Sequence, residues 1–360
     1  MKSEILKSEI LKSEILKSEI QKSEIQKSEV LKSEVLKLAK ECGADLMGVA
    51  PASRFPSNHK IFRIYPDVKS VIGFAFRCLR GSYRGTEEGT TYYQYTTMSV
   101  ENIEETVMPI ALVRLANLIE SAGFVAVPQR RHQTIMEEAD STNPEVAYDA
   151  IARGRTEEPQ FDFVDAAVRC GLGERGFHGA LLTDDFGPMQ RLCFILTDAE
   201  LAPDEPVRPH LCDRCGKCAA GCPGNCIGAD GAVDPWRCAV YYNGANGTKN
   251  PFMPPEAFPD FPDRLKIIAG EAEIDPAKAK RILDEIYFYP PAQHAYTCSI
   301  CGRACDVACY CHLEARGVLK RTFKTPFRTR PEWRFPLADF AAPPSAAAPR
   351  NEPLPLDCAR

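Results

Sequence analysis

The sequence predicts an α+β protein in which a mixed helix-and-sheet domain precedes a smaller, cysteine-rich domain. Two observations carry this prediction. Apolar runs typical of buried strands alternate with helically periodic segments between residues 38 and 200. Closely spaced cysteines then follow a proline-rich link at 203–209. The expected divisions are a repeat at 1–36, a helix-and-sheet domain at 37–203, a cysteine domain at 204–330 and a disordered proline- and alanine-rich tail at 331–360.

Short apolar runs are expected to form buried strands, and segments with apolar residues at helical spacing are expected to form helices. Gly43 and Gly123 follow two of these helices, as is typical of a helix C-terminus. The expected strands are 46–50, 70–76, 124–127 and 191–197, and the expected helices are 36–42, 110–122, 161–170 and 276–287.

Residues 2–36 repeat a pentamer of the type Lys-Ser-Glu-Ile-Leu seven times. A helix turns about 100° per residue, so each copy steps about 140° from the previous one and the apolar positions spiral over every face. The pattern therefore predicts no stripe that faces a core. We expect either a repeat without function or a self-association segment, and deletion of residues 2–35 is expected to leave folding intact.

The composition excludes several classes of protein. No apolar stretch reaches the roughly 18 residues that a membrane span requires. The formal net charge of -5 argues against attraction of the whole surface to nucleic acid. The 16 cysteines are clustered within a long chain, unlike the disulfide framework of a small secreted protein. Unpaired thiolates at metal-ligand spacing indicate a reduced, cytoplasmic and oxygen-sensitive protein.

The run Cys212-x2-Cys215-x2-Cys218-x3-Cys222-Pro223 has the cysteine spacing of bacterial ferredoxins. In those proteins three thiolates hold one 4Fe-4S cluster and the fourth ligates a second cluster. The alternatives are a zinc site or free thiols, but zinc favours two separated Cys-x2-Cys pairs. The run therefore predicts iron-sulfur ligation.

A second cluster needs further thiolates, and a second motif downstream supplies them. Crossed ligation, as in two-cluster ferredoxins, predicts Cys212, Cys215, Cys218 and Cys305 for the first cluster and Cys222, Cys238, Cys298 and Cys301 for the second. Nearby cysteines that could replace a ligand or be packed thiols are Cys226, Cys309 and Cys311. Cysteines expected in the core or the tail are Cys42, Cys78, Cys170, Cys193 and Cys358.

Further motifs stand in a fixed order along the chain. They are Gly171-Leu172-Gly173-Glu174, Gly179-Ala180-Leu181-Leu182-Thr183, Phe186-Gly187-Pro188, Thr197-Asp198-Ala199-Glu200-Leu201 and then the Cys212 run. Together they resemble the reductive dehalogenase and epoxyqueuosine reductase superfamily over about residues 38–330. Asp234-Pro235-Trp236-Arg237-Cys238 also resembles the segment in which those proteins place a lone ligand of the second cluster.

This resemblance implies a nitroreductase-like domain that holds cobalamin, followed by a ferredoxin-like domain with two 4Fe-4S clusters. The clusters would pass single electrons to cobalt, and the protein would supply orientation and a proton donor. The implied activity is reductive chemistry on a small electrophilic substrate, with an electron donor such as ferredoxin or flavodoxin.

The chain departs from both families of the superfamily. It begins with pentamers where respiratory dehalogenases carry a twin-arginine export signal, so we expect a cytoplasmic protein. Epoxyqueuosine reductases carry an Asp-Ser-Ala-Pro stretch with a proton-donating Asp, whereas this chain reads Arg155-Thr156-Glu157-Glu158-Pro159. A role on tRNA is weakened accordingly.

Candidate catalytic and cofactor-binding residues lie outside the cysteines. Tyr95 is the first candidate proton donor, and Glu157 could replace the missing Asp; clustered tyrosines otherwise serve packing. His178 lies where Gly176 would let the backbone approach a cofactor. Arg131 could bind an anionic substrate or a cobalamin phosphate, or belong to a solvated basic loop.

A basic run between residues 316 and 334 allows three interpretations: a nucleic-acid footprint, an offset to acidic groups of the chain, or a dock for an acidic electron donor. It has no recognised nucleic-acid module, so nucleic acid is not the expected partner. The two functions kept beside the reductase are a cofactor-free electron-transfer adaptor and an epoxyqueuosine reductase-like enzyme.

Overall fold

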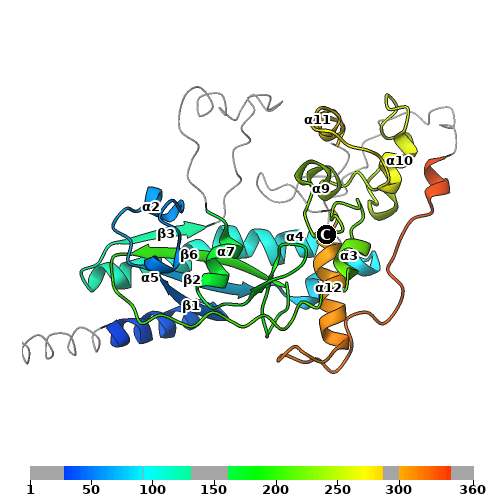
Figure 1. The fold of residues 1–360 in the computed structure, drawn as a ribbon. Coiled ribbons are helices and arrows are strands. Elements are labelled where there is room, and N and C mark those ends of the chain that lie inside the picture. The colour runs from blue at the N-terminus through cyan, green and yellow to red at the C-terminus, as the bar shows by residue number, and fades with distance from the viewer. Residues whose placement is uncertain (1–27, 92, 131–160, 287–299, 342–360) are drawn as a thin grey trace, which may run out of the picture.

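Antiparallel strands form a central four-stranded sheet, whose order is β1-β2-β6-β3. The structure is a computed structural model that describes residues 28–91, 93–130, 161–286 and 300–341. Each strand of this sheet overlaps one expected from the sequence (Figure 1). The strands are β1 (Leu46–Pro51), β2 (Ser70–Arg77), β3 (Ala126–Arg130) and β6 (Gln190–Thr197).

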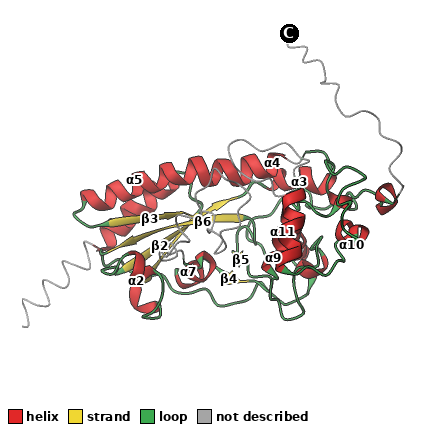
Figure 2. Ribbon diagram, turned by 90° about the horizontal axis from the view of Figure 1, so that it is seen from above, coloured by secondary structure: helices red, strands yellow, loops and turns green. Residues whose placement is uncertain are grey.

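Helices cover both faces of this sheet. Side chains alternate along β2, so Ile72 packs in a core with α5 (Met108–Ser121) while Val71 packs in another with α7 (Phe163–Arg169). α5 continues from η2 (Thr97–Val107), a π-helical segment, and the two run along the sheet (Figure 2). Because both faces are covered, the inner strands are apolar on both sides instead of alternating with polar residues.

Short elements complete this part of the fold, and the expected helices 110–122 and 161–170 are confirmed as α5 and α7. A two-stranded hairpin, β4 with β5, lies between α7 and β6 in the chain. The short elements are η1 (Ala52–Arg54), α2 (Ile61–Ile64), α3 (Arg80–Glu88), α4 (Tyr93–Thr96), β4 (Glu174–Arg175) and β5 (Leu181–Leu182).

The cysteine region lies at one end of the sheet (Figure 1). Two of its helices begin alike: Asp234 and Asp275 each accept a hydrogen bond from the N–H three residues on, and a proline opens each helix. Its elements are α8 (Lys217–Ala220), α9 (Pro235–Tyr242), η3 (Gly247–Lys249), α10 (Arg264–Ala269), α11 (Pro276–Glu285), α12 (Ala304–Ala315) and η4 (Leu337–Phe340).

The apolar residues of the cysteine region pack into two different hydrophobic cores. One is local to it and contains Tyr241 and Ile282. α12 packs elsewhere: its Tyr310 and Leu313 join Leu211 in the core that also holds one face of the sheet. The expected boundary at 203/204 is therefore not a break in packing, since α12 joins the cysteine region to the sheet.

The last copies of the repeat are part of the core, which corrects the expectation that the repeat buries nothing. A helix covers 28–41, and its Leu31 and Val35 are buried with Ala39. Leu31 of one copy and Val35 of the next are four residues apart, so they lie on the same face of the helix. Over all seven copies the apolar positions would still spiral around the helix. The other copies lie outside the described residues.

The C-terminal tail begins later than expected. Trp333 donates its backbone N–H to Glu87 at 3.0 Å, and the N–H of Phe335 bonds to Thr248 at 2.8 Å. Phe340 is buried in the local core of the cysteine region. Residues 331–341 are thus ordered by aromatic packing and backbone hydrogen bonds, and the rest of the expected tail lies outside the described residues.

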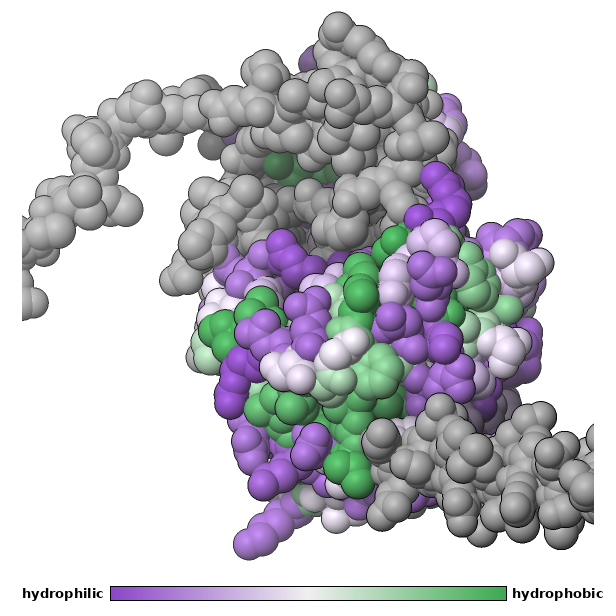
Figure 3. Space-filling view, turned by 90° about the vertical axis from the view of Figure 1, so that its left-hand side faces the viewer, coloured by the Kyte–Doolittle hydropathy of each residue, from purple (hydrophilic) through white to green (hydrophobic). Residues whose placement is uncertain are grey.

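Figure 3 looks at the end of the sheet that lies away from the cysteine region, and shows apolar side chains gathered among charged ones. Two exposed large apolar residues, Phe124 and Val125, lie between α5 and β3. Within the described ranges, no helix combines the length and the hydrophobicity that crossing a bilayer requires.

Candidate metal centre

Glu174 positions the first cysteine. This side chain is 2% exposed, and its carboxylate accepts hydrogen bonds from the backbone N–H groups of His210, Leu211 and Cys212, the last two at 3.0 and 2.7 Å. A Cβ at Gly173 would lie 2.1 Å from the carbonyl oxygen of Leu182, so this hairpin requires glycine there. The Gly-Leu-Gly-Glu motif therefore anchors the start of the cysteine run, a role that sequence reasoning did not assign.

The first three cysteines of the run wrap around the start of α8. Gly216 takes a left-handed φ of +71°, which turns the chain between Cys215 and Cys218. The backbone N–H of Phe177 donates to Cys212 Sγ at 3.3 Å. Such an N–H donor stabilises a thiolate and therefore suits a metal ligand.

A second group joins Cys222, Cys226 and Cys238. The N–H of Cys226 donates to Cys222 Sγ at 3.4 Å. Hydrogen bonding by the Cys226 thiol lowers the pKa of Cys222 to about 6 and that of Cys238 to about 7, while the same bonds raise the pKa of Cys226. These shifts favour the thiolate form of Cys222 and Cys238, which is the form that binds metal.

Charged residues lie beside these cysteines: His178 and Asp306 are buried, and Arg303 is half-buried. Asp306 Oδ1 lies 2.9 Å from His178 Nε2, and Arg303 Nε donates to Asp306 Oδ2 at 2.7 Å. The ligand atoms of His178, Cys305 and Asp306 all lie within 4.8 Å of one another. Burial lowers the pKa of His178, but hydrogen bonds to Asp306 and Cys218 outweigh it and raise the pKa to about 9.

The structure therefore gives His178 a different neighbourhood from the one expected, namely the cysteine region. Its partner Asp306 is 128 residues away in the chain, and sequence reasoning missed both Asp306 and Arg303. The sequence signal that could have identified them is their position, since Arg303 and Asp306 are charged residues that stand between cysteines of the second motif. The buried His178 and the half-buried Arg303 offset negative charge beside the cysteines, which favours a metal-thiolate site.

Tyr95 is fully buried in α4, and its hydroxyl oxygen accepts a hydrogen bond from Arg191 Nη2 at 3.1 Å. Arg191 Nη1 also lies 3.6 Å from a carboxylate oxygen of Glu104. Burial raises the pKa of Tyr95 well above its usual range, although Arg191 and Arg303 act in the opposite direction. The phenol therefore keeps its proton, and Arg303 lies close enough to link it electrostatically with the cysteine region.

Buried polar atoms without a hydrogen-bond partner lie on the segments around Tyr95. Within the described residues they include the hydroxyls of Thr96 and Ser99, both carboxylate oxygens of Glu101 and Nε of Arg191. A buried polar group left unpaired costs about 1–3 kcal/mol. Such a concentration is typical of a place where water or a polar ligand binds.

Other candidate residues are dispersed. Gly176 lies in the β4–β5 hairpin, where its N–H bonds to Ala180 at 2.8 Å. Cys78, Cys170 and Cys193 are buried, which confirms them as core thiols, and Cys42 is half-buried. Candidates outside the described residues are Arg131, Glu157, Cys298 and Cys358.

The cysteines present fit an iron-sulfur site. Within the described residues no cysteine forms a disulfide, and the described cysteines include seven of the eight expected ligands. The lowered pKa values of Cys222 and Cys238, the N–H donors to sulfur and the adjacent His178 and Arg303 favour the thiolate form that such clusters need. Zinc remains the weaker interpretation because the spacing is that of a ferredoxin run.

The basic run at 316–334 is largely paired within the chain. Arg328 bonds to the buried Glu87, Lys320 lies 2.7 Å from Asp184, and other members pair likewise. The remaining pairs are Arg316 with Asp213, Arg330 with Glu88 and Arg334 with Glu332. This arrangement favours the interpretation that the run offsets acidic groups of the chain.

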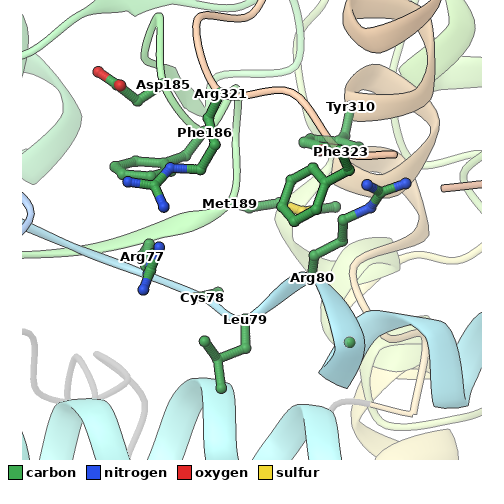
Figure 4. A pocket seen from close by; sticks show the side chains of 11 residues that line it. Arg77, Cys78, Leu79, Arg80, Asp185, Phe186, Met189, Tyr310, Arg321 and Phe323 are labelled. Carbon is green, nitrogen blue, oxygen red and sulfur yellow. The ribbon is translucent and has the colours of Figure 1, made fainter. Parts of the chain in front are cut away.

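A cavity of about 300 Å³ lies between the end of β2, the turn before β6 and α12 (Figure 4). Arg77, Arg80 and Arg321 line it together with aromatic side chains, and Asp185 is the one acid among the described lining residues. Tyr310, which follows Cys309 on α12, forms part of the wall. The cavity is therefore cationic and lies beside a cysteine-bearing helix.

Sequence comparison finds relatives that match short segments of the chain. Over 86 residues, 22% of this chain and 16% of the relative, the sequence is 41% identical to a tetrachloroethene reductive dehalogenase of Dehalobacter restrictus. Over 75 residues, 21% of this chain and 20% of the relative, it is 39% identical to an epoxyqueuosine reductase of Vibrio cholerae. The matches thus span a fifth or less of each relative's length. No protein-family model matches the chain.

Solved structures of the same two kinds are similar over more of the chain. An epoxyqueuosine reductase from Streptococcus thermophilus matches 79% of this chain and 82% of its own, with 16% identity and a TM-score of 0.41. A catabolic reductive dehalogenase in complex with 3-bromo-4-hydroxybenzoic acid matches 78% and 36%, with 15% identity and a TM-score of 0.42.

The mixed α+β fold and the ferredoxin-type cysteine spacing are typical of a protein that carries iron-sulfur clusters. Over these short segments the chain is similar to both reductive dehalogenases and epoxyqueuosine reductases, the two families that its motifs resemble.

Proposed function

We propose that the chain is an oxidoreductase with two 4Fe-4S clusters that passes single electrons to cobalamin for reductive chemistry on a small electrophilic substrate. The observation that carries this proposal is the pair of cysteine groups, which lie beside the buried His178 and the half-buried Arg303. Both kinds of relative named above are reductases, which supports a reductive activity.

The cysteine groups would hold the clusters. Cys212, Cys215 and Cys218 supply thiolates at the start of α8, and Cys222 and Cys238 supply thiolates to the second group. Arg303 and His178 offset the charge of these thiolates and of Asp306. Cys218 is buried and Cys222 and Cys238 are half-buried, which limits solvent access to these sulfurs, whereas Cys215 is exposed.

The unpaired polar atoms around Tyr95 support a polar ligand beside it, and cobalamin is our candidate. When bound, cobalamin would supply a low-valent cobalt for the reduction. The chain itself would hold a proton on the Tyr95 hydroxyl, oriented by Arg191, for transfer to the reduced substrate. Glu157, in the segment that corresponds to the Asp-bearing stretch of epoxyqueuosine reductases, is the second proposed acid.

The test is elemental analysis of the full chain, purified without oxygen after expression with added cobalamin. We expect about eight iron, about eight sulfide and about one cobalt per chain. Cys215→Ser should lose about half the iron, whereas Cys42→Ser, a half-buried cysteine outside both groups, should lose none. Protein that takes up no iron and sulfide would contradict the proposal.

The cobalt content of the purified protein distinguishes the cobalamin-dependent reductase from the cofactor-free electron-transfer adaptor. About eight iron without cobalt would favour the cofactor-free electron carrier, and the cobalamin part of the proposal would then be abandoned. An epoxyqueuosine reductase-like activity is tested by turnover of an epoxyqueuosine-containing anticodon stem-loop. The electron donor and the cytoplasmic location stay predictions.

A further inference from the structure

α8 and α12 begin in the same unusual way. Each follows a residue with left-handed backbone, Gly216 at φ +71° and Arg303 at φ +53°, and each places a cysteine two residues later. These cysteines are Cys218 and Cys305. A non-glycine residue in this region is strained and persists where the surroundings demand it, so the shared geometry is a structural match between the two motifs.

A second cysteine follows four residues later in both segments, as Cys222 and as Cys309. The residues just before them, Gly221 and Ala308, occupy matching positions and lie against each other. A Cβ on Gly221 would lie 2.7 Å from that of Ala308, closer than carbon atoms can approach. Contact between matching positions places a local two-fold axis between the two helices.

Around such an axis the two following cysteines point to opposite sides. Cys309 packs with Cys212 against the core that holds the sheet face. Cys222 and Cys238 instead pack against the local core of the cysteine region. Cys309 is therefore on the side of the first group, and Cys222 is on the side of the second.

The charges acting on each thiol agree with this partition. The cysteines that act electrostatically on Cys309 are Cys218, Cys212 and Cys215. Those that act on Cys305 are Cys301 and Cys222.

We infer that Cys309, and not Cys305, completes the first cluster. The first set is then Cys212, Cys215, Cys218 and Cys309, and the second is Cys222, Cys238, Cys301 and Cys305. Cys298 is no longer required as a ligand. This inference rests on the proposed function, because it assigns ligands to the clusters proposed there, and it replaces the assignment that motif spacing predicts.

The first test is iron per chain in two single variants of the full-length protein. Cys309→Ser should lose about half of about eight iron, and the remaining reduced cluster should lose the magnetic interaction with its neighbour in electron paramagnetic resonance. Cys311→Ser is the matched control: it lies on the same helix and is also half-buried, and no cysteine is among the main groups acting on it. Full iron in Cys309→Ser would overturn the inference.

Double variants test which thiols share a cluster. Cys212→Ser with Cys309→Ser should retain about four iron, since both changes affect one cluster. Cys212→Ser with Cys305→Ser should retain almost none, since both clusters lose a ligand. Retention of about four iron in this second pair would support the spacing-based assignment and refute ours.

Cys298→Ser keeps the inference testable if Cys309→Ser fails to fold. We expect this variant to keep its full iron, whereas the spacing-based assignment requires loss of about half. Wild-type protein without iron would overturn the proposed function itself. If the wild-type protein contains its full iron and Cys298→Ser contains only half of it, the proposed function stands and only the ligand assignment is overturned.

Discussion

At the scale of single residues, the structure shows the interaction partners of Tyr95, the first candidate proton donor. Tyr95 contacts Arg191 through its hydroxyl, and its ring centroid lies 4.7 Å from that of Tyr83. Packing and hydrogen bonding thus coexist in one side chain. The guanidinium of Arg191 is buried, so the Tyr95 oxygen is an acceptor whose loss water cannot easily replace.

Tyr95→Phe should lower the free energy of unfolding by about 1–3 kcal/mol, because Arg191 Nη2 loses its acceptor in a buried site. Urea denaturation of the protein measures this change, and iron per chain should stay unchanged. Tyr83→Phe is the control: its hydroxyl pairs with the neutral thiol of Cys78, so a smaller loss is expected. Equal losses in the two variants would show that the Arg191 contact adds nothing.

At the scale of elements, the helix at 28–41 shows how a repeat acquires a structural role. Leu31 and Val35 are 6% and 0% exposed, whereas Val30 is 52% exposed. The same pentamer thus supplies a buried and an exposed apolar residue. Lys32 also forms an ion pair with Asp204, in which its Nζ lies 2.8 Å from a carboxylate oxygen.

Val35→Ala should cost about 2 kcal/mol of unfolding free energy, because it removes two buried methyl groups and leaves a cavity. Val30→Ala, the matched change on the exposed side, should alter stability by less than about 0.5 kcal/mol. Thermal or urea unfolding of both variants provides the comparison. A negligible effect at Val35 would restore the original expectation that the repeat can be deleted without loss.

At the scale of the whole molecule, the C-terminal segment holds the two regions together. Arg328 pairs with Glu87 of α3, a carboxylate that is 6% exposed, and Trp333 lies directly against Gly89 at the end of the same helix. Glu314 of α12 also pairs with Arg80 at 3.0 Å. Acidic and basic groups that are distant in sequence therefore neutralise one another at this junction.

Arg328→Ala should destabilise the protein by about 2 kcal/mol, because it leaves the buried Glu87 carboxylate without its cation. Arg330→Ala removes a cation only two residues away, but Arg330 is 66% exposed and 3.4 Å from Glu88, so the expected loss is below about 0.5 kcal/mol. Differential scanning calorimetry compares the two. A similar small effect for both would argue that the junction depends on the aromatic contacts alone.

Local patterns in the sequence determined the elements and the kind of site. Apolar runs predicted the strands of the main sheet, Asp-Pro pairs mark the starts of α9 and α11, and the Cys212 run predicted iron-sulfur ligation. These features depend on residues within a few positions of one another, where helix and strand periodicity act directly.

Contacts between distant residues were decided only by the tertiary structure. The bond between His178 and Asp306, the anchoring of Cys212 by Glu174, and the contact of Gly221 with Ala308 each join separate segments. Cysteine spacing predicts how many thiolates one segment can offer, but it does not specify which thiolates meet. That depends on how α8 and α12 pack, because the side of a helix that a residue faces is settled by what the helix packs against.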